Sequence, residues 1–131
     1  MHKYAYPAVF TEEENGLYSV EFPDIEGCVT CGDNLNHAME MARDALSLML
    51  CELEDSGEDI PDASKVTDIK KDEKSFVSLI DCDTVEYRKS LDEGDITKTV
   101  TIPIWLNILA EKADIDFSAI LKRELKKELG I

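Results

Sequence analysis

Carboxylates are the side chains in this sequence best suited to catalysis or metal binding. Asp24, Asp81 and Asp83 are those that a nuclease-like site would use to hold Mg²⁺, and the last two share a face if both lie on one strand. However, 29 of the 131 residues are Asp or Glu, so such a pair is expected by chance. The serine, cysteine and histidine positions suggest no nucleophile with its base. The sequence therefore predicts no catalytic residues, and a residual metal-dependent nuclease stays an alternative.

A single C-x-x-C pair, Cys28 and Cys31, stands among four cysteines. A zinc site usually needs two more ligands, and His2 and His37 are the only histidines. Because both cysteines fall in a predicted strand, three residues apart, their thiols should point to opposite faces. We therefore expect reduced thiols and no metal or other cofactor.

Charge divides the chain into two parts. Residues 1–95 carry 24 acidic against 8 basic side chains, a net charge of −16, whereas residues 96–131 carry 5 against 6, a net charge of +1. An acidic body repels nucleic acid and attracts basic partners, although the acid could also serve solubility alone. The sequence predicts an acidic domain over 1–95 and a separate module over 96–131.

The apolar stretches are too short to cross a bilayer, and the start of the chain does not resemble a signal peptide. We therefore expect a cytoplasmic protein with no membrane partner.

Residues 1–95 alternate between strand and helix patterns. Strands are predicted over 3–10, 17–22, 28–31 and 75–82, the last as the clearest buried strand, with a short edge strand at 66–70. Pro7 favours an edge position or a bulge. Apolar residues spaced by three and four predict a helix from about 35 to 55, capped by Asp33 or Asn34. Ile60 and Pro61 should attach the polar loop 55–74 to the body. The class is α+β, a small sheet of three to four main strands with one packed helix.

Residues 96–131 predict one strand followed by two helices. Thr97–Ile102 alternates strictly, with Val100 and Ile102 on one face and threonines on the other. Pro103 suits a helix start, Asp116 can cap a second helix, and Gly130 can end it.

A lone strand has no pairing partner, and about 35 residues cannot bury enough surface alone. A symmetric dimer would pair the two strands and cover them with four helices, which is a ribbon-helix-helix module (β-α-α). The predicted dimerisation core comprises Val100, Ile102, Trp105, Leu106, Leu109, Leu121 and Leu125.

A two-stranded ribbon fits the DNA major groove. Thr97, Thr99 and Thr101 would then face the bases, while Lys98 and the second helix's start, at Phe117 and Ser118, would contact phosphates. Asp114 and Asp116 add negative charge there, and the outward face lacks Arg, Asn and Gln, so DNA affinity should be modest or depend on higher assembly. A tail that only dimerises is the alternative.

The segments Val100–Leu106 and Asp116–Ser118 resemble the ribbon-helix-helix tail of HicB antitoxins. Tyr6–Phe10, Phe22–Cys28 and Thr30–Asp33 are similar to the same family's N-terminal domain, and only residues 55–74 lie outside the likeness. The resemblance implies a reduced RNase H-like N-terminal domain that neutralises HicA, a small basic toxin that cleaves mRNA. It also implies a homodimer, or a higher oligomer, that binds operator DNA and regulates its own operon. An acidic protein-interaction module without DNA binding is the alternative function.

Overall fold

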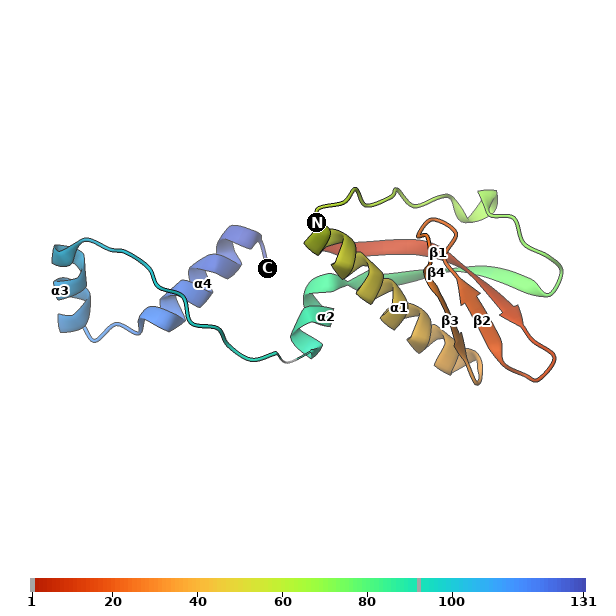
Figure 1. The fold of residues 1–131 in the computed structure, drawn as a ribbon, viewed down its shortest axis with the longest axis horizontal. Coiled ribbons are helices and arrows are strands. Elements are labelled where there is room, and N and C mark those ends of the chain that lie inside the picture. Colours follow the sequence, from red (N-terminus) through yellow and green to blue (C-terminus); the bar gives the residue numbers. More distant parts are fainter. Residues whose placement is uncertain (1, 92) are drawn as a thin grey trace. The chain divides into compact units, whose positions relative to one another are not determined.

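The computed structural model describes residues 2–91 and 93–131. The chain forms two compact units, one ending at Gly94 and one spanning Asp95–Ile131 (Figure 1). The first holds the sheet and its packed helix, and the second holds two helices. This confirms the α+β class.

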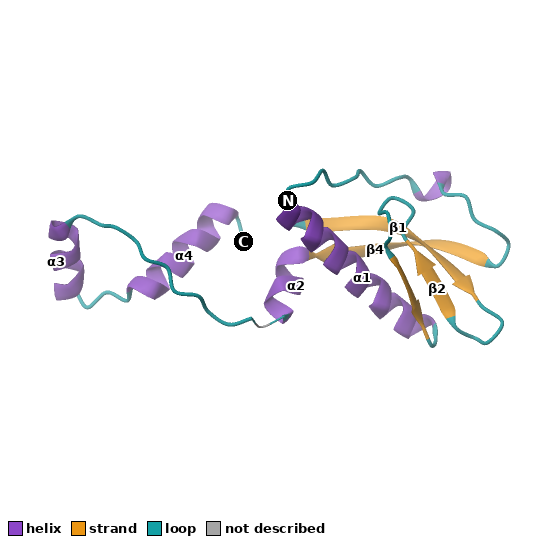
Figure 2. Cartoon of the chain, in the orientation of Figure 1, coloured by secondary structure: helices purple, strands orange, loops and turns teal. Residues whose placement is uncertain are grey.

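The N-terminal unit is built on a four-stranded antiparallel sheet (Figure 2). Its strands are β1 (Lys3–Glu12), β2 (Tyr18–Glu21), β3 (Val29–Gly32) and β4 (Ser75–Asp83), in the order β3-β2-β1-β4. Tyr6, Ala8 and Phe10 of β1 lie in the core under the long helix, and Pro7 between them is buried as well. The sheet therefore has an inner face, covered by the helix, and an outer face.

Helix α1 (Leu35–Ser56) covers the inner face. Asn34 caps it by accepting a hydrogen bond from the backbone N–H of His37, and Gly57 ends it in the left-handed conformation at φ 73°. Ala38, Ala42, Leu46 and Leu50 form its buried line, each with no exposed surface. This line confirms the apolar spacing read from the sequence.

Gly32 joins β3 to α1 where the two elements approach most closely. A Cβ atom at this position would lie 2.3 Å from the backbone nitrogen of Ala38. No side chain fits at that distance, so the junction requires glycine.

Two sequence predictions about strands are wrong. Strand β4 lies at the sheet's edge and pairs only with β1, so Phe76 and Leu79 are exposed rather than buried. Residues 66–70 form no strand, and Val66–Asp68 is instead a short 3-10 helix, η1. Pro7 lies in an inner strand, but in the part of β1 that extends beyond the pairing with β2.

The long loop is attached as predicted. Ile60 packs against the core, and the Tyr6 hydroxyl donates a hydrogen bond to the Pro61 carbonyl. Further along, the backbone N–H of Ser64 donates to Asp24 over 2.9 Å. These contacts hold a polar segment that has no regular hydrogen-bond ladder of its own.

Helix α2 (Thr84–Ser90) follows β4 directly and is joined to the core by Glu54. The Glu54 carboxylate accepts hydrogen bonds from the Tyr4 hydroxyl at 2.8 Å and the Thr84 hydroxyl at 3.0 Å. Its other oxygen pairs with Arg88 at 3.1 Å. One carboxylate thus links β1, α1 and α2.

The C-terminal unit contains α3 (Ile104–Lys112) and α4 (Phe117–Leu129), and neither helix has a buried residue. Asp116 caps α4 by accepting from the backbone N–H of Ala119, and Gly130 ends it at φ 73°. Both assignments agree with the sequence. Asp114 turns the chain between the helices with φ 55°.

The strand predicted over residues 97–102 is absent from the single chain, where this segment has no regular secondary structure. A strand is defined by ladder hydrogen bonds to a second strand, and the described residues of the C-terminal unit contain no second strand to pair with this segment. Val100 and Ile102 are therefore exposed.

Candidate partner-binding surfaces

The three carboxylates considered for a metal site have separate structural roles. Asp24 accepts hydrogen bonds from Ser64, Asp81 pairs with Arg43, and Asp83 caps α2. Within residues 2–91 and 93–131, no three His, Cys, Asp or Glu side chains gather as a metal site would require. The geometry thus gives no support to a nuclease centre.

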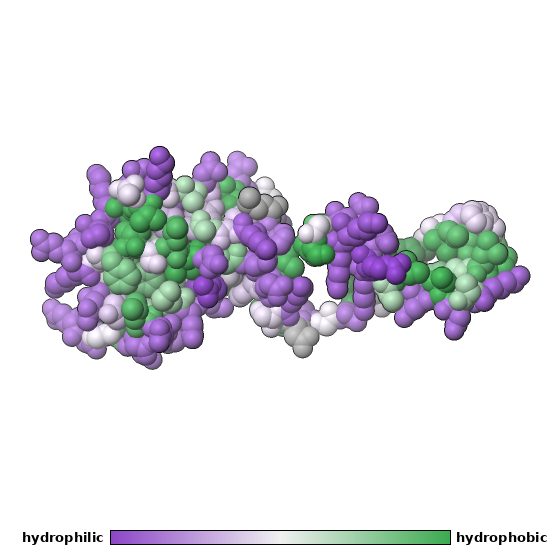
Figure 3. Space-filling view, turned by 180° about the vertical axis from the view of Figure 1, so that it is seen from behind, coloured by the Kyte–Doolittle hydropathy of each residue, from purple (hydrophilic) through white to green (hydrophobic). Residues whose placement is uncertain are grey.

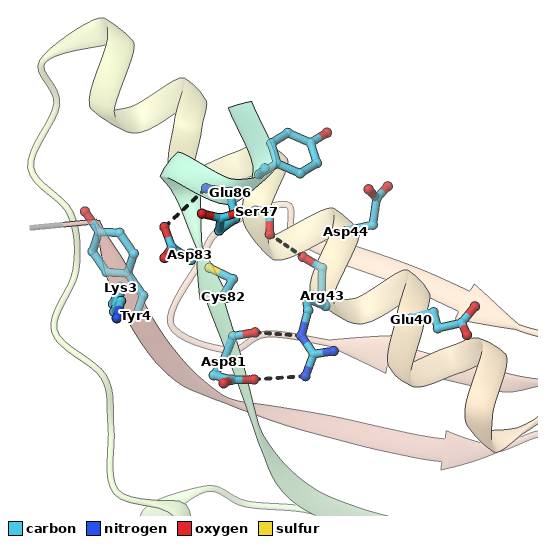
Figure 4. A pocket seen from close by; sticks show the side chains of 11 residues that line it. Lys3, Tyr4, Glu40, Arg43, Asp44, Ser47, Asp81, Cys82, Asp83 and Glu86 are labelled. Atoms are coloured by element: carbon cyan, nitrogen blue, oxygen red, sulfur yellow. Dashed lines mark hydrogen bonds and ion pairs between the residues drawn. The ribbon is translucent and has the colours of Figure 1, made fainter. Parts of the chain in front are cut away.

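Asp81 and Asp83 line an acidic pocket between α1, β4 and α2 (Figure 4). The Arg43 guanidinium contacts the Asp81 carboxylate at 2.9 Å and its carbonyl at 3.0 Å. Asp83 accepts from His2 at 3.0 Å and from two backbone N–H groups of α2. The hydrogen bond from His2, followed by those from the helix start, lowers the pKa of Asp83. Its carboxylate is therefore held as a stable anion.

The C-x-x-C thiols lie on opposite sides of the sheet, as predicted. Cys28 is buried in the core, whereas Cys31 is exposed on β3. Burial raises the pKa of both Cys28 and Cys82 to about 11. Because the thiolate is the reactive form, these two cysteines are poor nucleophiles at neutral pH.

The outer sheet face is the side of the sheet opposite to α1. Strand register places Val29, Glu21, Val9 and Val77 in one row across all four strands. On the same face, Leu79 pairs with Pro7 two residues to one side of this row. Cys31 pairs with Ser19 two residues to the opposite side of the row. Viewed from behind Figure 1, apolar residues gather centrally on this unit and polar residues surround them (Figure 3).

The C-terminal residues assigned to dimerisation are all exposed in the single chain. Trp105 is 63% exposed and Leu125 is 51% exposed. Leu106, Leu109 and Leu121 are exposed as well. This unit therefore carries its apolar side chains without covering them.

The residues assigned to DNA are exposed too. Thr97, Lys98, Thr99 and Thr101 lie in the extended segment before α3, and Phe117 and Ser118 open α4. The Asp116 side chain already occupies one free N–H group at this helix start. The six residues thus lie in two separate segments of the C-terminal unit, 97–101 and 117–118.

A family model described as a HicB-like antitoxin of bacterial toxin–antitoxin systems matches residues 6–123. The chain belongs to this family. The likeness to HicB antitoxins drawn from the sequence is thus confirmed. No helix in the described parts of the chain has the length and apolarity needed to span a membrane.

Solved structures share the fold of this HicB-like antitoxin. A chain of a toxin–antitoxin complex from Streptococcus pneumoniae is 27% identical, with a TM-score of 0.62, covering 96% of this chain and 99% of that one. The Burkholderia pseudomallei antitoxin HicB is 22% identical, with a TM-score of 0.54, covering 99% of this chain and 98% of that one. An uncharacterised 14.9 kDa protein of Haemophilus phage HP1 is 28% identical over 95 residues, 70% of this chain and 71% of the phage protein.

Sequence reasoning missed two features of this family member. No sequence pattern indicates the role of Glu54, since its partners lie 30 or more residues away in the chain. The outer sheet face did have one, because Val9, Val29, Val77 and Leu79 fall at alternate positions to the core residues of their strands. Only the strand order shows that they form one surface.

Proposed function

We propose that this chain neutralises a small basic HicA-type toxin through its acidic N-terminal unit. The likeness to a chain of the Streptococcus pneumoniae toxin–antitoxin complex, which extends over 96% of this sequence, carries the proposal. The charge of −16 over residues 1–95 supports it, because complementary potentials speed association with a basic partner and suppress wrong ones. The same charge lets this unit compete with RNA for a cationic surface.

The test is the association rate with a HicA-type toxin, sought as a small basic protein encoded beside this chain's gene. Replacing six exposed carboxylates of the N-terminal unit by their amides should slow association by about tenfold at low salt and flatten its salt dependence. Stopped-flow fluorescence from about 20 to about 500 mM NaCl measures both effects, because charge screening strengthens over this range. An unchanged rate and salt slope would contradict the charge argument, and failure of the unmodified protein to bind would contradict the function.

We also propose that the C-terminal unit pairs with that of a second copy of the chain and binds the operon's promoter. Its support is the exposed apolar set from Val100 to Leu125 and the alternating segment 97–102, which lacks only a partner strand. A ribbon-helix-helix dimer would bury the apolar residues and present Thr97, Thr99 and Thr101 to DNA. A two-fold dimer requires an inverted-repeat operator.

Gel-shift measurements on the promoter test this second role. Thr99→Ala should weaken operator binding more than binding to unrelated DNA, since it removes a base contact. Lys98→Gln should weaken both alike, since it removes a phosphate contact. Binding by neither the antitoxin nor its toxin complex would leave the alternative, a unit that only dimerises.

A further inference from the structure

The outer sheet face carries exposed apolar residues on both of its edge strands. Val29 is 64% exposed and Leu79 is 56% exposed, at opposite margins of the same face. Val9 and Val77 lie between them and are half-buried. Antiparallel sheets that face water usually present polar residues there, so these exposed apolar residues mark a contact surface.

The charges on this face select its occupant. Glu21 is exposed on β2 and stands in the row between Val29 and Val9. Covering Glu21 without a cation would leave a carboxylate dehydrated and unpaired. A second copy of this unit would bring an equally acidic surface against it. A basic protein with an apolar centre fits both features.

We propose that the outer sheet face is the docking surface for the basic toxin. The inference rests on the proposed function, and it assigns that function to Val9, Glu21, Val29, Val77 and Leu79. In the acidic pocket beside α2, Asp81 and Asp83 already pair with Arg43 and His2, so these two carboxylates are less available to a cationic partner. The apolar centre supplies the buried area, and Glu21 sets the orientation of a cationic side chain.

Cys31 provides a natural probe of this assignment. It is exposed on the outer sheet face, next to Val29 along β3, whereas the other three cysteines are buried. A maleimide should therefore label Cys31 alone in the free protein. Adding the HicA-type toxin should slow that labelling at least about tenfold. In a Cys31→Ser, Leu48→Cys variant, with the thiol on the exposed side of α1, labelling should not change.

A matched pair of substitutions gives a second measurement. Leu79→Lys and Leu48→Lys change charge equally, at residues 56% and 45% exposed in the same unit. Leu79→Lys should raise the dissociation constant by about tenfold to a hundredfold, and Leu48→Lys by less than about threefold. Because both side chains are exposed, both variants should keep the circular dichroism and melting temperature of the parent.

The outcomes separate the surface from the function. If the unmodified protein binds the basic protein but Cys31 stays reactive and the two lysine variants bind equally, this surface assignment is overturned while the antitoxin function stands. If protection moves to the cysteine at position 48, toxin docks on α1 instead. If the unmodified protein does not bind, the proposed function itself fails, and this assignment with it.

Discussion

The two units of this chain treat their apolar residues in opposite ways. The N-terminal unit closes Phe10, Phe22, Leu46 and Leu50 between α1 and the sheet, all almost without exposed surface. The C-terminal unit leaves its leucines and Trp105 in contact with solvent and buries no helix residue. One unit is stabilised by its own core, whereas the other has no core, and of its two helices only α4 has a side-chain N-cap.

Helix caps alone do not stabilise a fold. Caps contribute about 1 kcal/mol each, and isolated helices of 9 and 13 residues are marginal in water without packing. The stability of the C-terminal unit must therefore come from another surface, which we propose is a second copy of the chain. We therefore expect the stability of the N-terminal unit to be independent of protein concentration and that of the C-terminal unit to depend on it.

The largest effect should follow from Leu125→Asn in the C-terminal unit. Losing about 2 kcal/mol of leucine burial in each of two copies would weaken the dimer by roughly a thousandfold. Sedimentation across a concentration series measures this. Lys126→Asn, the neighbouring position on the polar side of α4, should leave the dimer intact. A monomeric parent protein, or equal effects of both variants, would contradict the proposed dimer.

Leu46→Ala should instead destabilise the N-terminal unit. Leu46 has no exposed surface, so truncation should cost about 3 kcal/mol through lost burial and a residual cavity. Urea denaturation followed by circular dichroism should give the same loss at every protein concentration. Leu48→Ala, on the exposed side of the same helix, should cost under about 1 kcal/mol. A concentration-dependent loss would show that this unit also depends on a partner.

The elements that show regular apolar spacing in the sequence were predictable. The α1 stripe, its Asn34 cap and the two C-terminal helices with Asp116 and Gly130 follow from local spacing and local hydrogen bonds. The position of β4 was not, because an apolar run such as Ser75–Cys82 reads alike in the middle of a sheet and at its edge. Strand order depends on pairing between distant segments, which one sequence does not encode locally.

The candidate surfaces divide in the same way. The apolar residues of the C-terminal unit could be named from their spacing, but the 97–102 strand could not be seen in one chain because its partner is another molecule. The outer sheet face needed both strand register and strand order. The Glu54 contacts needed the packing of α1 against β1 and α2.

Glu54→Ala should have an intermediate effect, because it removes one acceptor shared by three elements of the N-terminal unit. We expect a loss of about 1–2 kcal/mol in unfolding free energy, against under about 0.5 kcal/mol for the exposed Glu52→Ala. Burial and then the hydrogen bond to Glu54 raise the pKa of Tyr4 to about 12. Tyr4 therefore stabilises the fold below pH 10, and this contribution disappears as the pH rises to about 12. In the variant, NMR titration should show a lower Tyr4 pKa, and an unchanged value would contradict the assigned contact.

The smallest effect concerns Asp83, whose carboxylate connects His2 to the start of α2. Asp83→Asn keeps a side-chain oxygen for the backbone N–H groups of Val85 and Glu86 but removes the charge. The pKa of Asp83 is lowered in the folded state, so its charge stabilises the fold above its ordinary pKa of 3.8, and that contribution is lost as the pH falls through the lowered value. Urea denaturation between pH 2 and 7, a span set by the ordinary carboxyl pKa, should show the parent losing stability more steeply in acid than the variant. Asp59→Asn controls for removing one negative charge from an acidic unit. Parallel curves for the parent and Asp83→Asn would mean that hydrogen bonding at this cap, rather than its charge, holds α2 on the N-terminal unit.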